Sequence, residues 1–459
     1  MKPMIKRYVH ASLICLALLP VASASALDLR LKLALPSTQL LLPAVSKPLS
    51  QKEGEISAEE YPIAQELRPL LNAKDYKAAL VILQKQDSKT MSAALLMIRA
   101  QIALQLQQYP GAEKDFKAAL VLLPDFVRAH QGLALLYLAS KQWEKAHPAL
   151  TTVISLGGGD AQIYGQLAYL NLSQHNGWSA VSAYQHALML APGNKSYQEG
   201  LLVALMQTKQ LLSAQSLVEE MLSADPGNIT LWLQRANTAL ELEDNIKALG
   251  SLEVAVRLGD KRPESRLVAA QLHMKTKNFK RATQLLQANI NHNQWDMATL
   301  DEVLSWLAYQ QQWQHISSLL DGVAKHTKKM NSQDLSRYYL HRAELAVGRG
   351  KTKAASKAYT KAINANPGNG SALIAHAKML AASKKYTHAE LLYNRAQALV
   401  SVREKALLGQ AQLFIDQRNY PAALELLRKV YQEYPENRDL EHNIRSLVSI
   451  IGMREQTEI

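Results

Sequence analysis

Cysteine is almost absent from this chain of 459 residues, which contains only Cys15. Cys15 lies within a short apolar run, residues 11–22, that follows three basic residues and precedes the small residues 24–26. This order of segments is typical of a secretory signal peptide, so we expect residues 1–26 to be cleaved. The mature chain then has no thiol to oxidise, which suits the periplasm or the exterior of a bacterium.

Long hydrophobic runs are missing as well. The run 11–22 is shorter than the roughly 20 residues of a membrane-spanning helix, and Pro20 interrupts it. The alternative of a retained membrane anchor stays open, whereas a lipoprotein signal is disfavoured because bulky Ile14 precedes Cys15. No second run is long enough to span a bilayer, so we expect no transmembrane segment in the mature chain.

The residue patterns of a catalytic or metal site are also missing. The 13 histidines are scattered, and none lies at metal-ligand spacing from another histidine or from cysteine. Histidines such as His273 and His376 are expected to be tolerated helix residues. Because no nucleophile with a nearby base emerges either, the sequence predicts no enzyme activity, no metal and no cofactor.

The sequence does contain a repeat of 34 residues. A small residue recurs at this interval, a larger apolar residue follows it by four, and another small residue precedes it by twelve. These spacings place one stripe on each of two helices, and small residues on facing stripes let two antiparallel helices pack closely. Eleven helical hairpins are predicted. Their phase-marking residues are Ala78, Ala112, Ala146, Ala180, Ala214, Ala248, Ala282, Ile316, Ala355, Ala389 and Ala423, with a five-residue insertion before Ala355.

Prolines occur where the hairpins should end. Pro124, Pro192, Pro226, Pro367 and Pro435 each lie twelve residues after the phase-marking residue. Proline cannot continue a helix, because it lacks the amide proton and clashes with the preceding turn.

A run of three glycines, residues 157–159, occupies the same proline slot in its repeat, since Gly158 lies 34 residues after Pro124. A phosphate-binding loop would need a preceding strand and a following Lys and Ser or Thr, but Asp160 follows the glycines. We therefore expect an inter-repeat turn.

The pattern resembles the tetratricopeptide repeat (TPR) family, over about residues 58–436. Repeats two, four and nine carry the family's pattern most fully; repeat two does so as Leu96, Ala100, Ala112, Phe116, Ala119 and Pro124. The resemblance implies an all-α fold, a right-handed superhelical solenoid of about eleven TPR helical hairpins with a C-terminal capping helix.

The expected organisation follows from the departures from the repeat. Leucines alternate along 27–35 and prolines follow, which predicts an extended N-terminal arm and linker, 27–57, after the signal. The first repeat has Glu66 at the small position, as an end repeat with a polar face would. The insertion around 325–334 divides repeats 1–8 (58–330) from repeats 9–11 (331–436), and a capping helix and tail, 437–459, complete the chain.

In this family the first helix of each repeat lines the inner wall, which implies an apolar groove in repeats three to six that could bind a peptide or helix. The alternative is that these side chains pack against neighbouring helices. The Lys and Asn array that grips a C-terminal carboxylate in some family members is absent. The implied groove residues are Leu135, Leu138, Tyr169, Leu172, Val203, Met206, Leu233, Asn237 and Leu240.

Basic residues exceed acidic ones by 52 to 39, and the excess gathers in residues 261–361, where 17 Lys or Arg face 7 Asp or Glu. This stretch could attract anionic partners, or it could serve solubility alone. Nucleic acid is disfavoured, because no recognition motif accompanies the charge. The candidate basic surface comprises Lys275, Lys277, Lys280, Arg281, Arg349, Lys351 and Lys353.

Together these features predict a periplasmic scaffold or adaptor that binds a segment of another cell-envelope protein. Two alternatives stay open: a component of polysaccharide export that contacts an acidic polymer, and an accessory of an envelope machine such as pilus assembly or a TonB system. The residues do not choose among them.

Overall fold

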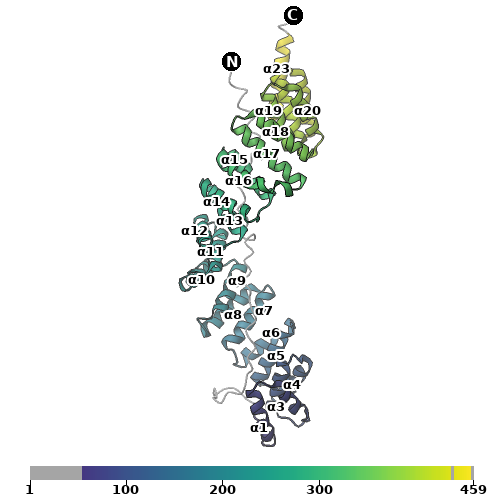
Figure 1. Ribbon diagram of the computed structural model, residues 1–459. Coiled ribbons are helices and arrows are strands. Elements are labelled where there is room, and N and C mark those ends of the chain that lie inside the picture. The colour runs from purple at the N-terminus through teal and green to yellow at the C-terminus, as the bar shows by residue number, and fades with distance from the viewer. Residues whose placement is uncertain (1–53, 436–438, 456–459) are drawn as a thin grey trace. The chain divides into compact units, whose positions relative to one another are not determined.

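The computed structural model describes residues 54–435 and 439–455, and over these ranges it contains 23 α-helices, short 3-10 helices and no strand (Figure 1). The described residues form two compact units, an N-terminal unit (54–251) and a C-terminal unit (252–435 with 439–455). The predicted signal peptide and nearly all of the predicted arm lie outside the described residues. The predicted array boundaries stay predictions.

The N-terminal unit consists of helices that alternate as the first helix (helix A) and second helix (helix B) of successive hairpins. Each helix contacts the next along the chain. Its helices are α1 (Tyr61–Asn72), α2 (Tyr76–Gln84), α3 (Ala93–Gln105), α4 (Tyr109–Leu122), α5 (Val127–Ala139), α6 (Trp143–Ser155), α7 (Ala161–Ser173), α8 (Gly177–Leu190), α9 (Lys195–Gln207), α10 (Leu211–Ala224) and α11 (Ile229–Glu241), preceded by η3 (Ala58–Glu60).

The division between the units falls within α12 (Asn245–Arg257). The C-terminal unit continues the alternation of helices A and B. Its helices are α13 (Pro263–Lys275), α14 (Phe279–Asn291), α15 (Met297–Tyr309), α16 (Trp313–Val323), η4 (Ala324–Lys329), α17 (Ser332–Gly348), α18 (Thr352–Ala365), α19 (Gly370–Ala382), α20 (Tyr386–Gln397), η5 (Val400–Val402), α21 (Arg403–Asp416), α22 (Tyr420–Glu433) and α23 (Asp439–Glu455).

Buried alanines line the contact between the two helices of most hairpins. On helix B, Ala112, Ala146 and Ala180 are fully buried, as are their counterparts in the later repeats. The alanines predicted to face them on helix A are fully buried too: Ala100, Ala134, Ala168, Ala236, Ala270, Ala343, Ala377 and Ala411. Methyl side chains let two helices approach closely, so the small residues determine the close packing of most hairpins; in the eighth hairpin buried Leu304 and Ile316 take their places.

The tight turn between helix A and helix B uses the left-handed backbone region once in every repeat. Only the ninth repeat has glycine there, although side chains make this conformation costly. The residues with positive φ are Lys74, Gln107, Lys141, His175, Lys209, Glu243, Lys277, Gln311, Gly350, Lys384 and Arg418.

The turns between hairpins follow the predicted punctuation. Pro124, Pro192, Pro226 and Pro367 each lie two residues beyond the end of a helix B. Asparagines that follow the last three prolines then accept hydrogen bonds from backbone amides in the first turn of the next helix A: Asn194, Asn228 and Asn369. Proline thus stops one helix and asparagine starts the next.

The three glycines form an inter-repeat turn, as expected. Gly157 has a φ of +83°, and a Cβ on Gly158 would lie 2.4 Å from Val127 Cγ1. The amides of Gly157 and Gly158 donate to Ile154 and Val153 at the end of α6, and Asp160 caps α7. Those amides are therefore engaged in ending a helix and are not available to a phosphate.

The first repeat departs from the predicted phase by one residue. Ala79 and Leu83 are fully buried, whereas the predicted Ala78 and Ile82 are only half-buried. Helix B starts three residues before its phase-marking residue in the other repeats, and α2 starts at Tyr76, which makes Ala79 the equivalent. One residue rotates a helix face by about 100°, so Leu67, not Glu66, faces the hairpin core.

The insertion and the C-terminal segment are both helical. The insertion forms η4 and lengthens the start of α17. In α23, Leu440 and Leu447 are buried against the last hairpin, and Ile444 and Ile451 pack beside them. The predicted capping helix is therefore confirmed.

Candidate interaction surfaces

The predicted groove residues divide into two groups. Four of them, Leu135, Leu138, Leu172 and Leu233, are buried, and Leu233 has no exposed surface. Their side chains pack within the unit, which was the alternative that the sequence left open. The other five are half-buried and form what we call the helix-A strip: Tyr169, Val203, Met206, Asn237 and Leu240.

The helix-A strip follows the repeat. Tyr169, Val203 and Asn237 occupy equivalent positions in α7, α9 and α11, and Met206 and Leu240 occupy another equivalent pair. Asn237 is its polar member. The Oδ1 atom of Asn237 is buried without a hydrogen-bond partner among the described residues, an unusual state for an amide oxygen.

Six of the seven predicted basic residues are exposed and have no ion-pair partner within the described chain. Arg281 differs, since its guanidinium donates to both oxygens of Glu253 at 2.9 and 2.8 Å. His273 Nε2 lies 2.7 Å from the same carboxylate. The bond from Arg281 is the main cause that holds the pKa of Glu253 below its usual value. Arg281 is therefore part of an internal ion pair rather than a free surface cation.

The two histidines that the sequence singled out pack as helix residues. His273 is buried beside Glu253, and His376 stacks on Tyr359 with ring centroids 5.2 Å apart. His376 Nε2 lies 3.0 Å from Ser356 Oγ, and burial lowers the pKa of His376. Within the described ranges no three potential metal ligands gather, and no helix is long and apolar enough to cross a membrane.

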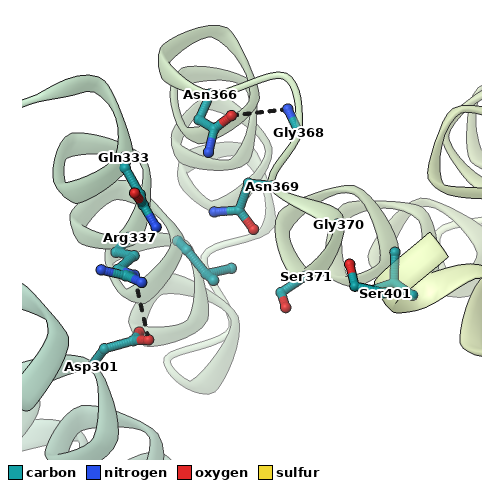
Figure 2. Close-up of a pocket in the computed structure, with 11 residues that line it drawn as sticks. Asp301, Gln333, Arg337, Asn366, Gly368, Asn369, Gly370, Ser371 and Ser401 are labelled. Carbon is teal, nitrogen blue, oxygen red and sulfur yellow. Dashed lines mark hydrogen bonds and ion pairs between the residues drawn. The ribbon is translucent and has the colours of Figure 1, made fainter. Parts of the chain in front are cut away.

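A polar pocket of about 280 Å³ lies in the C-terminal unit, and the sequence analysis did not identify it. Figure 2 shows Arg337 of α17 beside Asp301 of α15, across from Ser371 and Ser401. The turn between α18 and α19 adds Asn369. The pocket contains hydrogen-bond donors and acceptors and one charged group of each sign, Arg337 and Asp301. It is therefore suited to a polar ligand but favours neither anions nor cations. Its residues come from separate repeats and share no spacing in the sequence. Sequence reasoning therefore had no pattern from which to identify the pocket.

Beside this pocket, His341 is buried between two carboxylates. Its Nε2 lies 2.6 Å from Asp301 Oδ1 and its Nδ1 lies 2.8 Å from Glu344 Oε2. Burial alone would lower the pKa of His341, but the two carboxylates outweigh burial and raise it to about 9. His341 is therefore a charged link between α15 and α17 at neutral pH.

A row of exposed apolar residues in the N-terminal unit is a second feature that the sequence analysis missed. Trp178, Leu212 and Ile246 are 67%, 71% and 84% exposed, respectively. Each is the second residue of a helix B, in three consecutive repeats. The sequence could have revealed them, because all three lie two residues before a phase-marking alanine. That position lies outside the buried stripe, so an apolar residue there is not explained by the hairpin core.

Residues 97–161 and 340–404 match the family model of the tetratricopeptide repeat. One match lies in each unit, so the chain carries TPR repeats in both. No curated protein matches the chain.

Several solved structures are similar to the chain. A chain of the Naa15/Naa10 complex bound to HypK-THB is 16% identical, with a TM-score of 0.46; the match covers 85% of this chain and 66% of that one. Yeast Tom70 is 14% identical with a TM-score of 0.36, covering 87% and 98%. YrrB, described as a TPR protein with an unusual peptide-binding site, is 18% identical with a TM-score of 0.36, covering 40% and 92%.

Proposed function

We propose that this protein is a scaffold of the bacterial periplasm that binds a segment of another envelope protein on the helix-A strip. TPR repeats generally mediate contacts between proteins, and the chain carries such repeats in both units. The periplasmic location rests on the signal-like N-terminal sequence.

The observation that carries the proposal is the composition of the helix-A strip. Its five side chains recur at equivalent positions of three consecutive helices A, and all keep part of their surface exposed. An apolar segment of a partner could bury this surface, and a rotated Asn237 amide could accept a backbone N–H of that segment. The strip is thus mainly apolar, with one amide oxygen that lacks a partner among the described residues, which suits a peptide or a helix.

The test is photocrosslinking in cells from positions Tyr169 and Met206. We expect both positions to capture the same protein, and exposed Ser182, on helix B of the fourth repeat, to capture none. Val203→Glu places a charge between the two positions and should abolish capture while helical content is unchanged. Capture that is equal from Ser182, or that survives Val203→Glu, would reject the strip as the binding surface.

The second candidate, contact with an acidic polymer during its export, is supported by the exposed cations of the C-terminal unit. Lys275, Lys277 and Lys280 surround one hairpin turn, and Arg349, Lys351 and Lys353 surround another. Because these cations have no ion-pair partner within the described chain, their charge is available to an anion.

A further inference from the structure

The region around α18 is rich in cations and free of acidic residues. Residues 345–389 contain eight Lys or Arg and no Asp or Glu. This segment spans the end of α17, all of α18 and α19, and the start of α20. Acidic residues are common on helix surfaces, so a stretch of this length without one leaves its cations without local partners.

Three of these cations form a line on α18. Lys353, Lys357 and Lys361 are spaced four residues apart, so they lie on one face of the helix, about 6 Å apart along its axis. All three are exposed, and none has an ion-pair partner among the described residues. Lys361 Nζ lies 5.1 Å from the centre of the Tyr339 ring. We call these three residues the lysine stripe.

The helices that pack against α18 offer the stripe no free carboxylate. On α17, Asp334 pairs with Arg337, and Glu344 pairs with His341. On α19 there is no acidic residue. Like charges at this spacing repel one another and oppose the helix. The spacing of the stripe therefore does not stabilise α18, and its charges stay available to an anion.

The surroundings of the stripe narrow the class of ligand. No large apolar side chain is exposed on α18, whereas protein partners and membranes usually require such anchors. The stripe contains no arginine, which is the residue that best matches phosphate. The one ring known to lie beside it, that of half-buried Tyr339, already has Lys361 over its face and is a poor platform for bases. A row of point charges on a hydrophilic helix is best suited to a linear polymer with one carboxylate per unit.

We infer that the lysine stripe of α18 binds an acidic polysaccharide. This inference rests on the second candidate function and assigns the polymer a site on the exposed face of α18, which shares only Lys353 with the hairpin-turn cations. Binding through exposed charges must weaken as salt rises, since the charges are screened.

The test measures binding of polygalacturonate to the full chain at low and at physiological ionic strength. Substitution of the stripe, K353Q/K357Q/K361Q, should weaken binding about tenfold, the sum of three modest charge contacts. It should leave the melting temperature unchanged or raise it, because repulsion is relieved. The matched control is K325Q/K328Q/K329Q on η4, which removes three exposed charges from the same unit and should change binding little.

The possible outcomes distinguish an error in the proposed site, the lysine stripe, from an error in the proposed ligand, an acidic polysaccharide. K353R/K357R/K361R keeps the three charges and should retain binding. Retained binding in this variant would show that the glutamine variant loses binding through its missing charges and not through a folding defect. Equal loss in the η4 control, or loss only in K275Q/K277Q/K280Q, would overturn the stripe as the site. Equal binding of dextran, poly-glutamate or duplex DNA, or no binding of polygalacturonate, would overturn the ligand class. None of these results affects crosslinking from Tyr169 and Met206.

Discussion

The start of helix B differs between two sets of repeats, one in each unit, although each helix B follows the same kind of turn. In repeats four to six of the N-terminal unit its second residue is an exposed Trp178, Leu212 or Ile246, whereas repeats one to three have Lys77, Pro110 and Glu144 there. In the C-terminal unit the equivalent residues include Lys280 and Lys353, both exposed. Each helix B follows a turn with one left-handed residue.

This difference shows which residues of a repeat are constrained by the fold. The phase-marking position two residues later is buried in both units and is alanine in most repeats. The second position points away from the hairpin core, so it can be apolar in one repeat and cationic in another without changing the fold. Surface character in a repeat protein can thus vary from repeat to repeat while the core does not.

The largest expected effect tests the shared core. Ala180→Arg in the N-terminal unit and Ala355→Arg in the C-terminal unit each force a charge between two packed helices. We expect each to destabilise its unit by about 4 kcal/mol or more, since a buried unpaired charge is among the costliest substitutions. Thermal unfolding checks this prediction.

The control is Ser182→Arg on the exposed face of α8, which should change stability by less than about 0.5 kcal/mol. An unchanged melting curve for Ala180→Arg would contradict the hairpin contact. A large effect in only one unit would show that the two cores are not equivalent.

The second prediction concerns His341, a buried histidine of the C-terminal unit that is ion-paired to two carboxylates. The pKa of His341 is raised from 6.5 to about 9, so its stabilising contribution is complete below pH 6.5 and is lost as the pH rises through 9. A shift of this size corresponds to at most about 3 kcal/mol. Urea unfolding at several pH values, monitored by hydrogen exchange of the amides in α15 and α17, should show this decline in the free energy of unfolding.

The N-terminal unit serves as the internal control, because its described residues include no histidine ion-paired to a carboxylate. Helices α7 and α8 should show no comparable decline over the same pH window. His341→Gln removes the titrating group and should flatten the profile of α15 and α17. A profile that keeps its slope in this variant would assign the pH dependence to another group.

The smallest effect tests the shared turn. Lys141→Gly removes a side chain from a left-handed residue and should stabilise the N-terminal unit slightly, by up to about 1 kcal/mol. Gly350→Lys makes the opposite change at the equivalent turn and should destabilise the C-terminal unit by about 1 kcal/mol. Melting temperatures that move in the same direction for both variants would contradict a common turn conformation.

The repeat in the sequence determined most of the fold. Small residues spaced by 34 and prolines at the ends of hairpins specify helices, turns and close packing locally, so they could be recognised without a structure. The same logic identified the glycine turn at 157–159 and the capping helix. It failed by one residue in the first repeat, because the start of α2 is fixed by the structure and not by counting back from later repeats.

The tertiary structure alone decided which side chains stay accessible and which charges are free. Leu233 and Tyr169 both belong to the pattern of an inner wall, yet Leu233 is fully buried and Tyr169 is not. Arg281 and Lys280 are neighbours in sequence, yet only Arg281 reaches Glu253, 28 residues away. Periodicity reports the face of a helix, whereas exposure and ion pairing depend on what neighbouring helices place against that face.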